Sequence, residues 1–298
     1  MNNIFTRNRR IGARGPGTVL LAAALAIGCD ARRPTPPGAW PLAAPAELEG
    51  AQLLYQRPDG IWLLEIGAGL PRRLAEGGRW PRWAPDGRSF AFVRGNRILL
   101  RNLDNGAERD LAGADKPRAV AFHPEGREVW FTDGARVRAV PIAGGSPRDV
   151  LSGAEFMELA LSPDGRFVAA TVRALGGYRV ARFDVPSGAR RDLERGCSAG
   201  VSADGRCITV NRGGHDRLGL LDAETGESVG EILAPPGLRL DNQQWSNHPA
   251  WIAAVIEGDR QEVVLQRVSD GSVWRVTDTG DADRPDLHWV ERKPPVGD

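Results

Sequence analysis

The stretch Trp83-Ala-Pro-Asp-Gly-Arg88 decides the fold, because the same pattern occurs three more times along the chain. The further copies are Phe122-His-Pro-Glu-Gly-Arg127, Leu161-Ser-Pro-Asp-Gly-Arg166 and Val201-Ser-Ala-Asp-Gly-Arg206, so their first residues lie 39, 39 and 40 residues apart. A fifth, degenerate copy begins at Trp245, and we take Trp289 as the anchor of a sixth. A period of about forty residues indicates an array of supersecondary units. The sequence therefore predicts six units.

Each copy has the chemistry of a β-hairpin turn. Proline presets the first turn residue, the Asp or Glu accepts hydrogen bonds from nearby backbone amides, and glycine adopts a positive φ. Apolar or alternating segments follow the turns, as in Ser89-Phe-Ala-Phe-Val93 and Cys207-Ile-Thr-Val210, and they are typical of strands. A third strand, a glycine turn and a short outer strand then recur in each unit. Four short antiparallel strands per unit predict an all-β fold, a six-bladed β-propeller.

The two ends of the repeat array are incomplete in complementary ways. Residues 51–79 supply three strands but no innermost strand, whereas the last segment, Leu287 to Val290, supplies only that strand. Pairing them completes the first blade and leaves no open sheet edge. We therefore expect the first blade to be closed by the N-terminal strands and the C-terminal strand together.

The repeat resembles a known one. The W/F-S-P-D-G-R pattern followed by a strand is similar to the PD40, or WD40-like, repeat of the TolB family, and the resemblance covers residues 51–290. It implies the propeller fold, but such repeats occur in binding proteins, beside peptidases and in some polysaccharide lyases, so it does not fix the function. TolB also has an N-terminal α/β domain, which we do not expect here.

The N-terminus reads as an export signal with a lipid anchor. Arginines without acids precede an apolar run at 18–28, which is about half of the ~20 residues that span a bilayer. Leu25-Ala-Ile-Gly-Cys29 resembles the bacterial lipobox, so we expect signal peptide 1–28 and lipidation of Cys29, on a membrane facing the periplasm or exterior. The alternative is a plain secretory peptide cut near residues 22–24. We assign 29–50 as a Pro/Ala-rich tether, 51–291 as the propeller and 292–298 as a tail.

Composition narrows the partners. The 39 basic and 38 acidic residues are interspersed, so we expect no nucleic-acid partner. We expect no cofactor and a monomer, with an envelope protein or peptide as the partner and the membrane reached through the lipid anchor.

In a propeller, the residues that enter each innermost strand meet at one mouth of the channel. Three positions before the six anchors stand Trp80, Ala119, Glu158, Ser198, Asn242 and Asp286. We take Trp80, Glu158, Ser198, Asn242 and Asp286 as candidate partner-binding residues. Because two of them are acids, the ring could take a cationic or peptide ligand; the alternative is that all are solvated turn residues.

Catalytic and metal signatures are weak. Gly196-Cys-Ser-Ala-Gly200 matches G-x-S-x-G, but a nucleophile elbow needs a helix after the serine, and a hairpin motif follows here. The four histidines lack a metal-ligand spacing, so we predict no catalytic and no metal residues.

Cys197 and Cys207 lie on the two strands of one hairpin, where export would allow a disulfide. A simple register places Cys207 opposite Gly200, which would leave the cysteine Cα atoms beyond the ~7 Å bridging limit. A disulfide and two free thiols both remain open.

The favoured function is a non-catalytic cell-envelope lipoprotein that serves as a protein- or peptide-binding scaffold. The alternatives are a propeller hydrolase or lyase acting on peptide or glycan, which needs convergent catalytic groups at one mouth, and a small-ligand sensor with a closed pocket.

Overall fold

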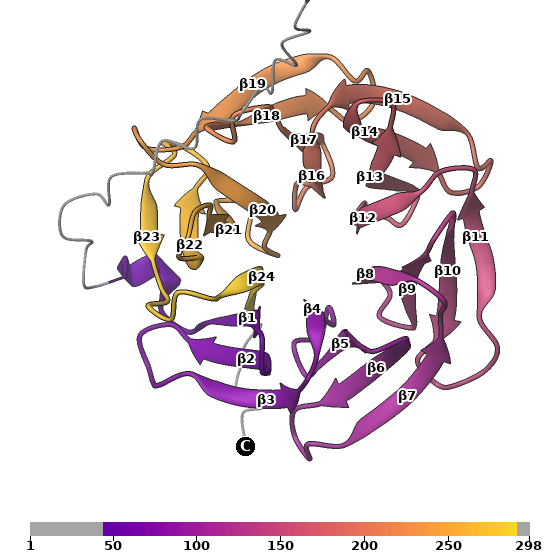
Figure 1. Cartoon of the computed structure of the whole chain (residues 1–298), viewed down its shortest axis with the longest axis horizontal. Coiled ribbons are helices and arrows are strands. Elements are labelled where there is room, and N and C mark those ends of the chain that lie inside the picture. Colours follow the sequence, from indigo (N-terminus) through magenta and orange to yellow (C-terminus); the bar gives the residue numbers. More distant parts are fainter. Residues whose placement is uncertain (1–43, 291–298) are drawn as a thin grey trace, which may run out of the picture. The chain divides into compact units, whose positions relative to one another are not determined.

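The computed structural model describes residues 44–290, which contain 24 β-strands and one short 3₁₀ helix, η1 (Ala46–Leu48). The strands form six four-stranded antiparallel sheets, arranged as blades around a central axis (Figure 1). The predicted six-bladed β-propeller is therefore confirmed. Within the described residues, no helix is both long and apolar enough to cross a bilayer. The predicted signal peptide 1–28, the lipidation site Cys29 and the tail 292–298 lie outside them.

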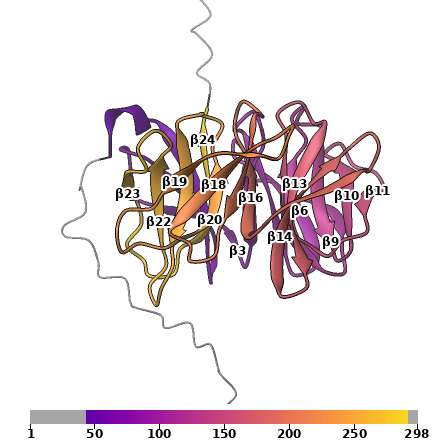
Figure 2. The same cartoon turned by 90° about the horizontal axis from the view of Figure 1, so that it is seen from above.

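Each blade runs from an innermost strand beside the axis to an outermost strand at the rim (Figure 1). Seen from the side, the blades form a single layer (Figure 2). Blade 1 contains β24 (Asp283–Trp289), β1 (Ala51–Arg57), β2 (Gly60–Glu65) and β3 (Arg72–Glu76). Blade 2 contains β4 (Arg79–Trp83), β5 (Ser89–Arg94), β6 (Arg97–Asn102) and β7 (Glu108–Gly113). Blade 3 contains β8 (Pro117–Phe122), β9 (Glu128–Asp133), β10 (Arg136–Pro141) and β11 (Arg148–Ser152).

The second half of the ring follows the same order. Blade 4 contains β12 (Phe156–Leu161), β13 (Phe167–Ala174), β14 (Gly177–Asp184) and β15 (Arg190–Arg195). Blade 5 contains β16 (Cys197–Val201), β17 (Cys207–Asn211), β18 (Arg217–Asp222) and β19 (Ser228–Leu233). Blade 6 contains β20 (Leu240–Trp245), β21 (Trp251–Ile256), β22 (Glu262–Arg267) and β23 (Val273–Arg275).

Blade 1 is completed from both ends of the chain, as predicted. Strand β24 pairs antiparallel with β1, with Leu53 opposite Leu287, and both leucines are buried. The Asn247 amide, in the blade 6 turn, donates to the carbonyl of Trp289 (2.8 Å) and accepts from its N–H (2.9 Å). The closing strand is therefore held by β1 on one side and by blade 6 at its end.

The chain joins the ring before residue 51. Leu48 in η1 is fully buried in one apolar cluster with Trp251 and Leu287. The Glu47 carboxylate pairs with the Arg267 guanidinium of blade 6. The last part of the predicted tether is thus part of the folded unit.

Apolar side chains fill the spaces between blades. The tryptophans Trp83, Trp130 and Trp245, each in a strand of the repeat, are 6%, 2% and 8% exposed and belong to this core. Trp289 is only partly buried, and its ring lies 5.1 Å from that of His248.

The repeated turns have the predicted chemistry and also touch one another. The Asp164 carboxylate accepts from the Ser162 hydroxyl (2.7 Å) and the Arg166 N–H (3.0 Å), and these two bonds hold the pKa of Asp164 below its usual value. Gly165, in the same turn, has φ +70°, and a Cβ there would lie 2.6 Å from His123 Nε2 in the preceding turn. Neighbouring turns are therefore packed against each other, so the turn sequence links blades as well as strands.

Candidate functional site

Each innermost strand carries an irregularity where it enters its blade, next to the axis. In β4, β16, β20 and β24 the register shifts at one residue, in each case a non-glycine residue with a left-handed backbone. These residues are Trp80 (φ 52°), Ser198 (φ 52°), Asn242 (φ 52°) and Arg284 (φ 49°). Bulges and left-handed non-glycine residues are costly and cluster at functional sites. These four residues therefore identify this end of the channel as the candidate ligand-binding site.

The sixth position of the ring is Arg284, and the prediction of Asp286 was wrong. In β4, Trp83 follows the left-handed Trp80 by three residues; in β24, Leu287 follows Arg284 by three. The true sixth anchor is therefore Leu287 rather than Trp289. Aromatic residues occupy several other anchors, so the sequence pattern favours Trp289, but the pairing of β24 with β1 sets the register and places Leu287 opposite Leu53.

The channel is closed just inside this mouth. Arg284 Nη1 lies 2.7 Å from Oε1 of Glu158 on β12, and β12 lies across the ring from β24 (Figure 1), since contacts between neighbouring innermost strands run β24–β4–β8–β12 on one side and β24–β20–β16–β12 on the other. The other Glu158 oxygen accepts from the Ser198 N–H (2.8 Å) and the Thr171 hydroxyl (2.7 Å). Below the pair remains a space of about 20 Å³, room for roughly one water. The Arg284–Glu158 ion pair therefore forms a floor.

Above the floor lies the mouth pocket, about 660 Å³ in volume, a size that suits a small molecule or a few residues of a peptide. Trp80, Glu158, Asn242 and Arg284 line its inner part. The Arg79 guanidinium lies 4.7 Å from the centre of the Trp80 ring, which fixes a flat aromatic surface on one side. Its wall contains, besides these, Lys116, Arg118, Met157, Tyr178, Cys197, His215 and Asp241.

The structure brings three of the five predicted contacts to this pocket and places two elsewhere. Trp80, Glu158 and Asn242 line it. Ser198 is 2% exposed and faces the narrow space below. Asp286 is 8% exposed and lies between blades, where it accepts from the Trp83 N–H (2.7 Å). Burial raises the pKa of Asp286 to about 6.

The two acids do not form a site for a cation. Asp286 does not line the mouth pocket, and Glu158 is paired with Arg284. The wall instead carries both signs of charge, with Arg79, Lys116 and Arg118 among the cations and Asp115 and Asp241 among the carboxylates.

Cys197 and Cys207 are free thiols, which is the second of the two alternatives. The turn closes between Ser202 and Cys207, so Gly200 faces Thr209 and the expected pairing of Cys207 with Gly200 was wrong. Cys197 stands opposite Asn211, four residues beyond Cys207 and hence about 13 Å along β17. No disulfide can form in this register.

The G-x-S-x-G match lies in a strand followed by a hairpin, as expected. Ser198 Oγ donates to Asp241 Oδ1 (3.2 Å), so the serine positions a carboxylate.

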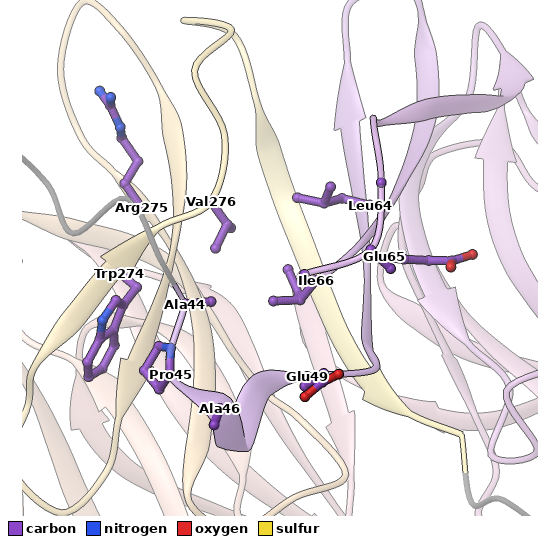
Figure 3. Close-up of a pocket in the computed structure, with 13 residues that line it drawn as sticks. Ala44, Pro45, Ala46, Glu49, Leu64, Glu65, Ile66, Trp274, Arg275 and Val276 are labelled. Atoms are coloured by element: carbon purple, nitrogen blue, oxygen red, sulfur yellow. The ribbon is translucent and has the colours of Figure 1, made fainter.

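A second pocket, about 520 Å³, lies at the rim between η1, the β2–β3 loop and β23 (Figure 3). Ala44, Pro45 and Trp274 line one side, and Leu64 and Ile66 the other. It marks where the N-terminal segment packs on the ring, away from the mouth residues.

Sequence reasoning missed Arg284, Lys116, Arg118, His215 and Asp241. One signal was available for two of the missed residues: Arg118 and Asp241 both stand four positions before their anchors, Phe122 and Trp245. Lys116 and His215 lie in loops outside the repeat pattern.

A six-bladed β-propeller with a floored pocket at one mouth is the class of protein that this fold and site define. No family model and no curated protein matches the sequence. Among solved structures, the chain is similar to TolB from Acinetobacter baumannii, with a TM-score of 0.66 and 16% identity over 82% of this chain and 67% of that one. A protein designated TolB from Agrobacterium tumefaciens gives 0.63 and 16% over 78% and 90%. A chain of a nidogen/laminin complex gives 0.65 and 11% over 82% and 100%. At these identities the likeness shows the fold, which is a TolB-like β-propeller.

Proposed function

We propose that this protein is a non-catalytic cell-envelope lipoprotein that binds a protein or peptide at the mouth pocket of its propeller. The observation that carries the proposal is the pocket itself: about 660 Å³ of space above a floor made by Arg284 and Glu158. A ligand can enter this mouth but cannot thread the channel. Such a pocket accommodates a loop, a chain terminus or a short peptide on the surface of a partner.

The chemistry of the wall supports a peptide. Trp80 and Tyr178 supply aromatic surface, which contributes contact area at low entropic cost. Lys116 and Asp241 supply opposite charges within the same wall. A peptide carries apolar groups and both signs of charge, so it can satisfy this lining, whereas a polyanion would be repelled by the carboxylates of Asp115 and Asp241.

The envelope location rests on the N-terminal residues. The arginine-rich start, the apolar run and the lipobox-like Leu25-Ala-Ile-Gly-Cys29 support export and acylation. The TolB-like fold supports the same location, and the nidogen/laminin structure is a propeller in a protein complex.

The test is crosslinking and affinity purification of the full-length protein from its own membranes. We compare the wild type with Lys116→Glu, an exposed charge reversal in the pocket wall, and with Arg109→Glu, an exposed reversal on the outermost strand β7. We expect one enriched protein that is lost with Lys116→Glu and kept with Arg109→Glu. Equal recovery with both variants, or no specific protein with the wild type, would reject binding at the mouth.

The anchor is tested separately by metabolic labelling with a fatty acid analogue. We expect label on the wild type and none on Cys29→Ala, which should leave the membrane fraction. Label on neither form would reject lipidation without touching the binding proposal.

A further inference from the structure

Three side chains with metal-binding atoms converge in the wall of the mouth pocket. Cys197 begins β16, Asp241 is the second residue of β20, and His215 lies in the loop between β17 and β18. Cys197 Sγ is 3.7 Å from His215 Nε2 and 3.9 Å from Asp241 Oδ1, and the three donor atoms all lie within 4.8 Å of one another. It is the one such group of three among residues 44–290. All three residues line the pocket.

The spacing suits a tetrahedral ion. With a Zn–S bond of about 2.3 Å and Zn–N or Zn–O bonds of about 2.0 Å, neighbouring donor atoms in a tetrahedron stand roughly 3.5 Å apart. The sulfur-to-nitrogen and sulfur-to-oxygen distances of 3.7 and 3.9 Å exceed that value by only a few tenths of an ångström. The third distance, between the His215 nitrogen and the Asp241 oxygen, is at most 4.8 Å, against about 3.3 Å in a tetrahedron, so these two side chains would have to close by up to about 1.5 Å on binding.

The surrounding residues orient the donors as in known metal sites. His215 Nδ1, on the far side of the ring from Cys197, lies 3.3 Å from the Glu257 carboxylate, and Arg239 pairs with the same carboxylate at 2.8 Å. A carboxylate that accepts from the far nitrogen of a ligating histidine fixes its tautomer and raises its basicity; Glu257 lies at that distance, although His215 Nδ1 makes no hydrogen bond of good geometry in this structure. Asp241 Oδ1 in turn accepts from Ser198 Oγ (3.2 Å) and Asn211 Nδ2 (3.4 Å).

The backbone adds to this arrangement. His215 has φ 56°, its N–H donates to the Arg212 carbonyl (3.0 Å), and its carbonyl accepts from the Leu240 N–H (2.7 Å). The Leu240 N–H that holds His215 belongs to the residue just before Asp241. A left-handed histidine with both its N–H and its carbonyl bonded is a strained conformation of the kind that functional sites retain.

We propose that Cys197, His215 and Asp241 bind a divalent transition-metal ion, Zn²⁺, with a fourth coordination position open to the mouth pocket. Thiolate, imidazole and carboxylate are the three donor types that zinc takes, and three protein ligands are typical of sites that keep one position free. Binding forms the sulfur–metal bond and releases the thiol proton to solvent. The site does not depend on the pocket's ligand being a peptide.

A nucleophilic cysteine is the competing interpretation. Cys197 lies next to His215, and the other ring nitrogen of His215 lies next to Glu257, which is the order of nucleophile, base and acid in a catalytic triad. Cys197 Sγ lies 3.9 Å from Asp241 Oδ1, and a carboxylate beside the sulfur opposes the thiolate that a reactive cysteine needs. A metal ion removes this conflict because its charge compensates both the thiolate and the carboxylate.

The test uses the full-length protein in detergent, stripped with a chelator and titrated with Co²⁺ as a spectroscopic probe and then with Zn²⁺. We expect one equivalent of Co²⁺ with a sulfur-to-cobalt charge-transfer band, displaced by Zn²⁺. Cys197→Ser should abolish the band, whereas Cys207→Ser, the other free thiol of the same blade, should keep it. Glu257→Gln should weaken affinity by about 10- to 100-fold.

A measurement on the wild type covers the case in which a variant fails to fold. Zn²⁺ should protect Cys197 from alkylation, read by mass spectrometry, and leave Cys207 unprotected. Absence of stoichiometric uptake, equal loss of the band in both serine variants, or equal alkylation with and without Zn²⁺ would overturn the proposal. Rapid alkylation of Cys197 at neutral pH that requires His215 would overturn it in favour of the nucleophile.

Discussion

Asp286 and His288 lie two residues apart on the closing strand, and burial shifts their pKa values in opposite directions. The pKa of Asp286 is raised from 3.8 to about 6, so its contribution to stability is present below pH 3.8 and is lost as the pH rises through 6. The pKa of His288 is lowered from 6.5 to about 4, so its contribution is present above pH 6.5 and is lost as the pH falls through 4. Each shift corresponds to about 3 kcal/mol. The two therefore nearly cancel in the wild type.

Single substitutions should reveal the two slopes. Relative to the wild type, the free energy of unfolding of Asp286→Asn should increase from pH 4 to pH 7, by up to about 3 kcal/mol, because only the histidine term remains. His288→Gln should show the opposite slope. Urea unfolding at pH 4, 5, 6 and 7 measures both. Variant profiles that run parallel to the wild-type profile would contradict the assigned pKa shifts.

The ion pair in the channel floor should matter more than an exposed one. Arg284 and Glu158 side chains are 25% and 19% exposed, so Arg284→Met should lower the free energy of unfolding by about 1–3 kcal/mol. A double-mutant cycle with Glu158→Gln gives the coupling. The control pair Arg136–Asp149, at 59% and 51% exposure, should show a coupling of about 0.5 kcal/mol or less. Similar coupling energies for the two pairs would mean that the Arg284–Glu158 pair stabilises the fold no more than an exposed ion pair does.

At the scale of the element, the turn motif should have two separable roles: its glycine adopts a left-handed backbone, and the turn packs against the turn of the neighbouring blade. Gly165→Ala places a Cβ at φ +70° and 2.6 Å from His123 Nε2, whereas Gly188→Ala has the same φ of +70° and nothing within 4 Å. Gly188→Ala should therefore report the backbone strain alone, about 1–2 kcal/mol, and Gly165→Ala should cost more. Adding His123→Ser should bring Gly165→Ala back to the level of Gly188→Ala. Equal effects of the two glycine variants in urea unfolding would exclude a contribution from blade-to-blade packing.

The strands themselves were predictable, and their irregularities were not. Turn chemistry and apolar alternation are local, so the hairpin at Asp164 and the buried strands around it could be read from the repeats. The bulges at Trp80 and Arg284 depend on register, which the partner strand sets. In the other blades the turn motif locates the anchor residue, but β24 is a single strand without such a turn. The sequence of β24 therefore does not show which residue is the anchor, and the prediction placed Asp286 in the ring position that Arg284 occupies.

At the scale of the whole molecule, the sequence repeat predicts the ring of blades but not which side chains meet in the mouth pocket. The mouth gathers residues from all six blades, so Glu158 and Arg284 meet although 126 positions separate them. His215 reaches Cys197 from a loop that the period does not describe. Convergence of this kind follows from closure of the ring, and only the three-dimensional structure reveals which side chains pair there.

Closure should also be the step on which the stability of the whole ring depends. Strand β24 covers the edge of β1, buries Leu287 and supplies the acceptor of the Trp83 N–H. A chain ending at residue 282 should lose at least about 3–5 kcal/mol, a large share of a typical domain stability of 5–15 kcal/mol, and should unfold without a single cooperative transition. A chain ending at residue 290 is the control and should match the full-length protein. Adding the peptide 283–290 in trans should restore the cooperative transition, because the open edge of β1 can accept it. If the shorter chain unfolds at the same urea midpoint as the control, blades 2 to 6 are stable without closure and the ring does not fold as one unit.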